Sequence, residues 1–150
     1  MTSIEVQGSV PRFSRVEIGA FVRKVLLTLE KLDKLNEGVS EVSIAFVDDE
    51  HMRGLNRKFR HKSSTTDVLT FPADDSYGDP SKGGGRPLGD IVISVDQARR
   101  QATDEKHSLA MEVRYLILHG ILHALGYDHE SDNGEMNALE IAVRAAVGLD

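Results

Sequence analysis

Three histidines in the last third of the chain have the side-chain type and the spacing of a metal site. His119 and His123 are four residues apart, so on a helix both imidazole rings lie on one face and can reach a single ion. Gly126 follows where a helix can end in a left-handed conformation, after which the chain can bring His129 back to the same ion. Three neutral imidazoles that leave one coordination position open are typical of a catalytic zinc site. We therefore predict that His119, His123 and His129 bind a metal ion.

The available ligands limit which metal can bind and how. The chain has no cysteine, so a metal must be held by His, Asp or Glu side chains. One Zn²⁺ per chain is the expected ion, although Ni²⁺ or Co²⁺ would suit similar ligands. A fourth ligand from Asp128 or Glu130 would close the site and favour a structural role for the metal. No residue is assigned to any other cofactor.

The residue after the first histidine separates two classes of metal enzyme. The metzincin proteases have the pattern H-E-x-x-H-x-x-G-x-x-H, in which the glutamate activates water. This chain matches the three histidines and the glycine, but Gly120 stands at the glutamate position. Peptide hydrolysis by that mechanism therefore lacks its base, and a zinc peptidase remains an alternative on the metal-ligand spacing alone.

A cationic segment lies well before the histidines. Five basic or potentially basic side chains fall within six positions: Arg57, Lys58, Arg60, His61 and Lys62. One interpretation is a solvated helix end, where cations are favoured by the helix dipole. The other is a phosphate-binding rim, for which Arg60 is the preferred residue because a guanidinium binds phosphate oxygens in pairs and keeps its charge.

The elements around these residues predict an α+β fold. β-branched or alternating runs predict four strands, at residues 4–6, 42–47, 67–71 and 89–94. Helical spacing predicts five helices, at 16–35, from Asp48 or Asp49 through 59, from the fourth strand to about 106, at 108–125 and at 133–147. A loop rich in Gly, Pro and Asp spans 73–87. Because strands and helices do not alternate regularly, we expect one domain over residues 1–150 with a mixed sheet.

Composition narrows the setting of the protein. Lys and Arg number 18 against 24 Asp and Glu, a net charge of −6, which argues against a protein that coats nucleic acid without sequence preference. The chain begins without the basic start and apolar run of a secretory signal. Its densest apolar stretch, residues 115–125, is too short to span a membrane. We therefore expect a cytoplasmic protein with no membrane partner.

Three segments of the chain carry a family resemblance. They read LNRKFR at 55–60 followed by TDVLTFP at 66–72, LGDIVIS at 88–94, and HGILHALGYDH at 119–129. In this order they resemble the bacterial YbeY family of endoribonucleases and ribosomal RNA maturation factors. The resemblance implies a zincin-like α+β fold, a zinc-like metal on His119, His123 and His129, and cleavage of single-stranded RNA. Arg60 falls on the functionally important arginine of the family.

The resemblance also implies a biological role. The expected role is maturation of small-subunit ribosomal RNA and ribosome quality control, with RNA as the substrate and no role for DNA. A ribosomal small-subunit protein or an assembly GTPase is the expected protein partner. A ribosome-assembly factor without catalytic activity, whose metal is structural, remains a second alternative beside the peptidase.

The chemistry expected at the site divides between the metal and Arg60. The metal would polarise a phosphodiester oxygen or lower the pKa of a bound water toward ~7. Arg60 would stabilise the charge that develops in the transition state. The nucleophile stays open between a hydroxide at the metal and the 2′-hydroxyl of the substrate. No general base is assigned, because Asp67, Asp90 and Asp128 are each more typical of caps, turns or partners of a ligand.

Overall fold

Four strands form one mixed sheet at the centre of the molecule. The computed structural model describes residues 2–35, 38–62, 64–73, 86–128 and 130–149. In spatial order, the strands are β1 (Ser3–Gln7), β2 (Val39–Val47), β4 (Arg86–Ser94) and β3 (Val68–Pro72). β2 is parallel to both β1 and β4, whereas β3 runs antiparallel to β4 and forms an edge of the sheet. The predicted strands are confirmed, and β2 and β4 begin three residues earlier than the sequence indicated.

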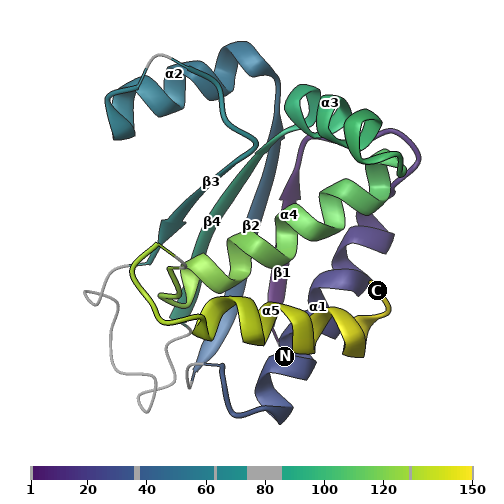
Figure 1. Ribbon diagram of the computed structural model, residues 1–150, viewed down its shortest axis with the longest axis vertical. Helices are drawn as coiled ribbons and strands as arrows, with labels where there is room; N and C mark the ends of the chain where they lie inside the picture. Colours follow the sequence, from purple (N-terminus) through teal and green to yellow (C-terminus); the bar gives the residue numbers. More distant parts are fainter. Residues whose placement is uncertain (1, 36–37, 63, 74–85, 129, 150) are drawn as a thin grey trace.

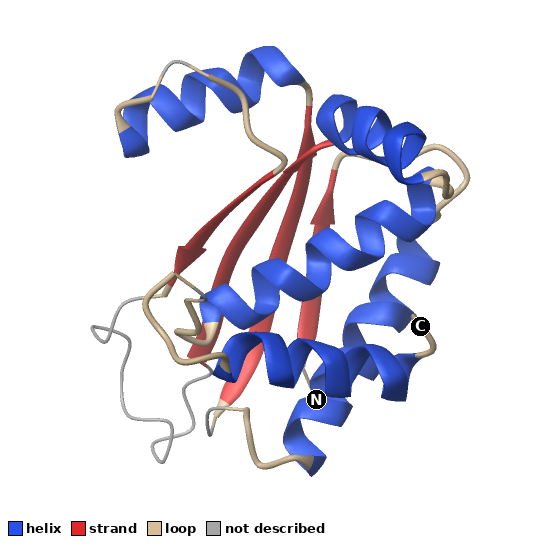
Figure 2. Ribbon diagram, viewed as in Figure 1, coloured by secondary structure: helices blue, strands red, loops and turns tan. Residues whose placement is uncertain are grey.

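Five helices surround the sheet in the described part of the chain (Figures 1 and 2). They are α1 (Arg15–Lys31), α2 (Asp49–Arg60), α3 (Val95–Glu105), α4 (Leu109–Ala124) and α5 (Glu135–Val147). α4 crosses one face of the sheet, and α5 and α1 lie beside it. α2 lies at the top left of Figure 1, beyond the ends of the strands. The predicted α+β class with a mixed sheet is therefore confirmed.

The two faces of the sheet bury very different amounts of apolar surface. On β4, Ile91 and Ile93 join the large core formed with α1, α3, α4 and α5. Val92 points the opposite way and joins a small cluster with Met52 of α2 and Leu69 of β3. Because successive side chains of a strand face opposite sides, this alternation assigns α4 and α2 to opposite faces. Edge strand β3 lies where the two helices can contribute to one site.

One helix ends earlier than its sequence pattern indicates. The apolar spacing predicts a helix to residue 35, but α1 ends at Lys31 with Leu32 as its C-cap. Asp33 then takes a left-handed conformation, with φ of 58°, and the Lys34 N–H donates to the Leu29 carbonyl. The turn therefore closes before the pattern of apolar residues runs out.

Two further observations bear on the expectations from sequence. No helix among the described residues is long and apolar enough to cross a membrane. Most of the loop predicted at 73–87, namely residues 74–85, lies outside the described residues.

Candidate active site

Helix α4 holds its two histidines rigidly because both of its ends are fixed by local chemistry. The Ser108 side chain accepts a hydrogen bond from the Met111 N–H, which caps the first turn. At the other end Gly126 has φ of 101°, its N–H donates to the His123 carbonyl, and the Tyr127 N–H donates to the Leu122 carbonyl. These two bonds form a Schellman motif, so the predicted ending at Gly126 is confirmed.

The two histidines of α4 converge as their spacing predicts. The Nε2 atoms of His119 and His123 are 3.0 Å apart, and the rings meet at 73°. A tetrahedral zinc with Zn–N distances of about 2.0–2.1 Å requires two ligating nitrogens to be about 3.3 Å apart. Both side chains are half-buried. The pair therefore fits the donor geometry of one metal ion without a change of the helix.

A carboxylate from α5 lies on the far side of the His119 ring. Glu140 Oε1 is 3.8 Å from His119 Nδ1 and 3.4 Å from Arg144 Nη2. The nearby His119 ring, together with the Arg144 charge, holds the pKa of Glu140 below its ordinary value, although partial burial acts to raise it. An ionised Glu140 favours a proton on Nδ1 and leaves the Nε2 lone pair toward His123. Sequence analysis did not identify Glu140.

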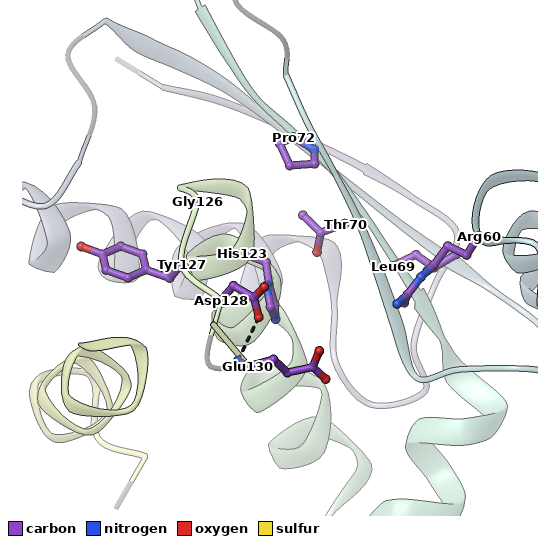
Figure 3. A pocket seen from close by; sticks show the side chains of 9 residues that line it. All are labelled: Arg60, Leu69, Thr70, Pro72, His123, Gly126, Tyr127, Asp128 and Glu130. Atoms are coloured by element: carbon purple, nitrogen blue, oxygen red, sulfur yellow. Dashed lines mark hydrogen bonds between the residues drawn. The ribbon is translucent and has the colours of Figure 1, made fainter. Parts of the chain in front are cut away.

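One histidine of the pair, His123, lines a cleft of about 450 Å³. His123 lies on one side, near the segment that follows α4, and Arg60 lies on the opposite side beside Leu69 of β3 (Figure 3). The other residues lining the cleft are Thr70, Pro72, Gly126, Tyr127, Asp128 and Glu130. The structure therefore brings Arg60 and a predicted metal ligand to one cleft, although they are 63 positions apart in the chain.

The third predicted ligand, His129, lies outside the described residues. Within the described residues, no third His, Asp or Glu joins His119 and His123 as a possible metal ligand. Asp128 and Glu130 line the cleft without completing such a group, and the Asp128 carboxylate instead accepts the Glu130 N–H at 3.0 Å. The described geometry therefore gives no support to a carboxylate as the fourth ligand.

Helix α2, which carries Arg60, is anchored at its start by a polar network. The Asp48 side chain accepts the His51 N–H at 2.8 Å and caps the helix. The Asp49 carboxylate accepts hydrogen bonds from side chains of three separate segments: Thr65 before β3, Ser94 at the end of β4, and Arg100 of α3. This network fixes the start of α2 relative to the strands that border the cleft.

The last turn of α2 presents its cations to solvent. Arg57, Lys58 and Arg60 occupy this turn, and His61 ends the helix in a left-handed conformation with φ of 58°. Buried Asn56 donates to the Ser64 carbonyl at 2.8 Å, which secures the following segment to the helix. The cationic segment is therefore a helix end whose Arg60 reaches the cleft, and phosphate binding by Arg60 stays a prediction.

The geometry at position 120 argues against the peptidase alternative. Gly120 is buried on the side of α4 that faces β4. A Cβ atom added there would lie 2.7 Å from Ile91 Cγ2, closer than packed carbon atoms can approach. A glutamate at this position would therefore require the Ile91 side chain or the helix to shift. The packing of α4 against β4 thus disfavours the residue that the peptidase mechanism needs.

The remaining acidic and aromatic candidates have structural partners. Asp67 accepts from the Gln101 side chain, and Asp90 is exposed on β4, so neither lines the cleft. Tyr115 donates its hydroxyl proton to the Leu149 carbonyl, away from the cleft. His107 stands apart from the other histidines in the sequence, which favours a surface residue, but it is half-buried and pairs with Glu112 at 2.6 Å.

The fold and the site together define a class of protein. It is an α+β protein in which a pair of histidines converges on a buried helix, and one of them borders a cleft with an arginine from a separate helix. A family model described as Endoribonuclease YbeY matches residues 3–148. The chain therefore belongs to the YbeY family.

Individual relatives agree with this assignment. A protein of Nautilia profundicola is 48% identical over 100 residues, which are 67% of either chain. One from Moorella thermoacetica is 47% identical over 120 residues, covering 75% of this chain and 76% of the relative. Both are named Endoribonuclease YbeY. The solution structure of TM1509 from Thermotoga maritima aligns with a TM-score of 0.57 and 25% identity, covering 97% of this chain and 90% of that one.

Proposed function

We propose that this chain is a metal-dependent endoribonuclease that cleaves single-stranded RNA in the cleft between His123 and Arg60. The observation that carries the proposal is the convergence of His119 Nε2 and His123 Nε2 to 3.0 Å beside a cleft lined by Arg60, in a chain of the YbeY family. The relatives are named as endoribonucleases, so RNA is the substrate class.

The metal of this proposal is one Zn²⁺, held by His119, His123 and, by the resemblance, His129. Two imidazoles at this separation, with Glu140 beside the Nδ1 of one, match the donor set and the supporting carboxylate of a catalytic zinc site. When bound, such an ion acts as a Lewis acid toward a phosphoryl oxygen and lowers the pKa of water.

The chain supplies the remaining functions through its own side chains. Arg60 binds the non-bridging phosphate oxygens in pairs and stabilises the negative charge that builds on them. Glu140 retains the proton on His119 Nδ1, which keeps the ring oriented. Asp128 and Glu130 line the same cleft and can accept the proton of the nucleophile, which is water or the 2′-hydroxyl of the RNA.

The biological setting follows from the resemblance and the charge. We assign the enzyme to the cytoplasm, with small-subunit ribosomal RNA as its substrate and a role in ribosome quality control. A chain of net charge −6 gains little general attraction to RNA, and its cations gather at one end of α2. A ribosomal small-subunit protein or an assembly GTPase that delivers the enzyme to its RNA would compensate for this weak attraction.

Metal content and RNA cleavage measured on the same samples test the proposal. Wild type should contain one metal ion per chain and cleave single-stranded RNA, and a chelator should abolish cleavage. His123→Ala should remain folded by circular dichroism but lose both metal and cleavage. A peptide substrate assayed in parallel should not be cleaved.

The outcomes separate the alternatives. Cleavage that persists in both chelated wild type and His123→Ala would exclude the metal-dependent nuclease. Loss of folding in His123→Ala and in chelated wild type alike would indicate a structural metal. Analysis of the product ends then identifies the nucleophile, because attack by the 2′-hydroxyl leaves a 2′,3′-cyclic phosphate and attack by water does not.

A further inference from the structure

An exposed aromatic ring lies next to Arg60. Among the described residues, five large apolar side chains are exposed, and Phe59 is the one aromatic ring in this group. About half of Phe59 is accessible to solvent, and its ring packs edge-to-face on Phe71 of β3, with centroids 5.1 Å apart. The edge-to-face contact orients the Phe59 ring while leaving much of its surface open.

The ring pair lies beside the proposed active site. Arg60 follows Phe59 on α2, and Phe71 lies between Thr70 and Pro72 on β3. Arg60, Thr70 and Pro72 line the cleft, whereas the two phenylalanines do not. A second hollow, lined by Phe71, meets the cleft at Pro72, which lines both. An RNA chain that leaves the cleft at Pro72 therefore reaches Phe71, on which Phe59 packs.

The charges around the two rings favour RNA phosphates on one side of the rings and disfavour them on the other. Lys58 Nζ lies over the Phe59 ring, 5.3 Å from its centre, so a base that stacks there would displace this flexible exposed side chain, and Arg57 occupies the same helical turn. The hollow beside Phe71 instead contains Glu41 and Asp90, which repel phosphate. Phosphates are therefore favoured along the end of α2, while a base, which carries no charge, can occupy the aromatic surface.

From this arrangement we propose that Phe59, supported by Phe71, stacks on an unpaired base of the RNA next to the nucleotide whose phosphate contacts Arg60. The proposal rests on the proposed function, since it assigns a second contact to the same substrate. Stacking on an aromatic face tolerates any base and requires a base that is free of pairing. Phe59 would therefore contribute to the preference for single-stranded RNA rather than to sequence preference.

The test measures binding separately from cleavage. The probe is a fluorescently labelled single-stranded oligonucleotide of 2′-O-methyl RNA, and its anisotropy is followed on the metal-loaded protein at several salt concentrations. Its length is checked after each titration, because the methyl group blocks attack by the 2′-hydroxyl but not by water. Phe59→Leu keeps an apolar contact with Phe71 but removes the aromatic face, whereas Phe59→Trp keeps that face. Leu27→Ala removes a comparably exposed apolar side chain from α1 and is the matched control. Arg57→Gln is the control for charge.

We expect Phe59→Leu to weaken binding about tenfold at every salt concentration, and Phe59→Trp and Leu27→Ala to bind like wild type. Arg57→Gln should instead reduce the slope of log K against log salt by about 0.7. Three results would overturn the stacking site. They are unchanged RNA binding by Phe59→Leu, an equal loss of RNA affinity in Leu27→Ala, or a fall in the Tm of Phe59→Leu that accounts for its loss of affinity. Wild type that binds no single-stranded RNA would overturn the proposed function as well, a result distinct from failure of Phe59 alone.

Discussion

Helices α4 and α2 supply residues to the same cleft, but different forces hold them in place. α4 buries eight residues between the sheet and the other helices. Five of them are large apolar residues within three positions of His119. α2 buries Met52 and Asn56, and the Asp49 network tethers its start. His119 and His123 thus lie on a helix that is packed into the core, whereas Arg60 lies on a mostly exposed helix at the edge of the sheet.

This difference separates two requirements of the proposed chemistry. Ligands of a metal must keep their geometry to within fractions of an ångström, and burial of the helix on a close-packed core provides that rigidity. An arginine that binds RNA must instead be accessible to a large substrate. Substitutions at the buried positions of α4 should therefore affect folding, and substitutions at the end of α2 should affect RNA cleavage with little effect on folding.

The largest effect is expected where α4 meets the sheet. Gly120→Glu would place a charged side chain against Ile91, and we expect it to lower the free energy of unfolding by about 4 kcal/mol or to prevent folding. Gly54→Glu makes the same change on α2, where an added Cβ meets nothing within 4 Å, and should alter stability by no more than about 1 kcal/mol. Urea denaturation measures both, and equal losses would contradict the contrast between the helices.

Arg60→Ala is expected to have the next largest effect, and on activity. Loss of a charge that stabilises the transition state should lower the cleavage rate about 10²- to 10³-fold. Because Arg60 is exposed, its Tm should stay within the error of wild type. Arg53→Ala, also exposed on α2, is the control and should cleave normally. A rate for Arg60→Ala close to that of wild type would remove Arg60 from the site.

Glu140→Gln tests whether a residue of α5 positions the histidine of α4 that it faces. Loss of the carboxylate beside His119 Nδ1 should weaken Zn²⁺ binding about 10- to 100-fold, measured by competition with a chelating dye. Ile141→Ala changes the next residue of α5, which is exposed, and should bind Zn²⁺ like wild type. If both variants bind like wild type, Glu140 does not position the ligand.

Asp49→Asn should have the smallest effect, and that effect should depend on pH. Burial acts to raise the pKa of Asp49, but hydrogen bonds from Arg100, Ser94 and Thr65 outweigh it and hold the pKa below its ordinary value. The ionised form therefore stabilises the fold above the pKa of the unfolded chain, and this contribution is lost as pH falls through the lower folded pKa.

We accordingly expect the free energy of unfolding of Asp49→Asn to be about 1–2 kcal/mol below that of wild type at pH 7. This difference should disappear below about pH 4. Urea denaturation over this pH range provides the measurement. Asp104→Asn, an exposed position on α3, should match wild type throughout. A gap that stays constant with pH would show that the charge of Asp49 does not contribute.

Local patterns explain which elements could be predicted. The ends of α4 follow from Ser108 and Gly126, because a cap acts on the turn beside it. The end of α1 was misplaced because apolar residues continue to Leu35, whereas the backbone already turns at Asp33. Glu140 could not be recognised, because its role depends on the packing of α5 beside α4 and not on any spacing within α5.

The sequence by itself determined the histidine pair, since four residues make about one helical turn and place two side chains on one face. It also determined that any metal site lacks cysteine, and it singled out Arg60 as the preferred cation. Only the tertiary structure decided that Arg60 shares a cleft with His123, that Glu140 faces His119, and that Gly120 contacts Ile91. These contacts depend on the strand order β1-β2-β4-β3 and on which face each helix covers, and both are set by burial of apolar surface over the whole chain.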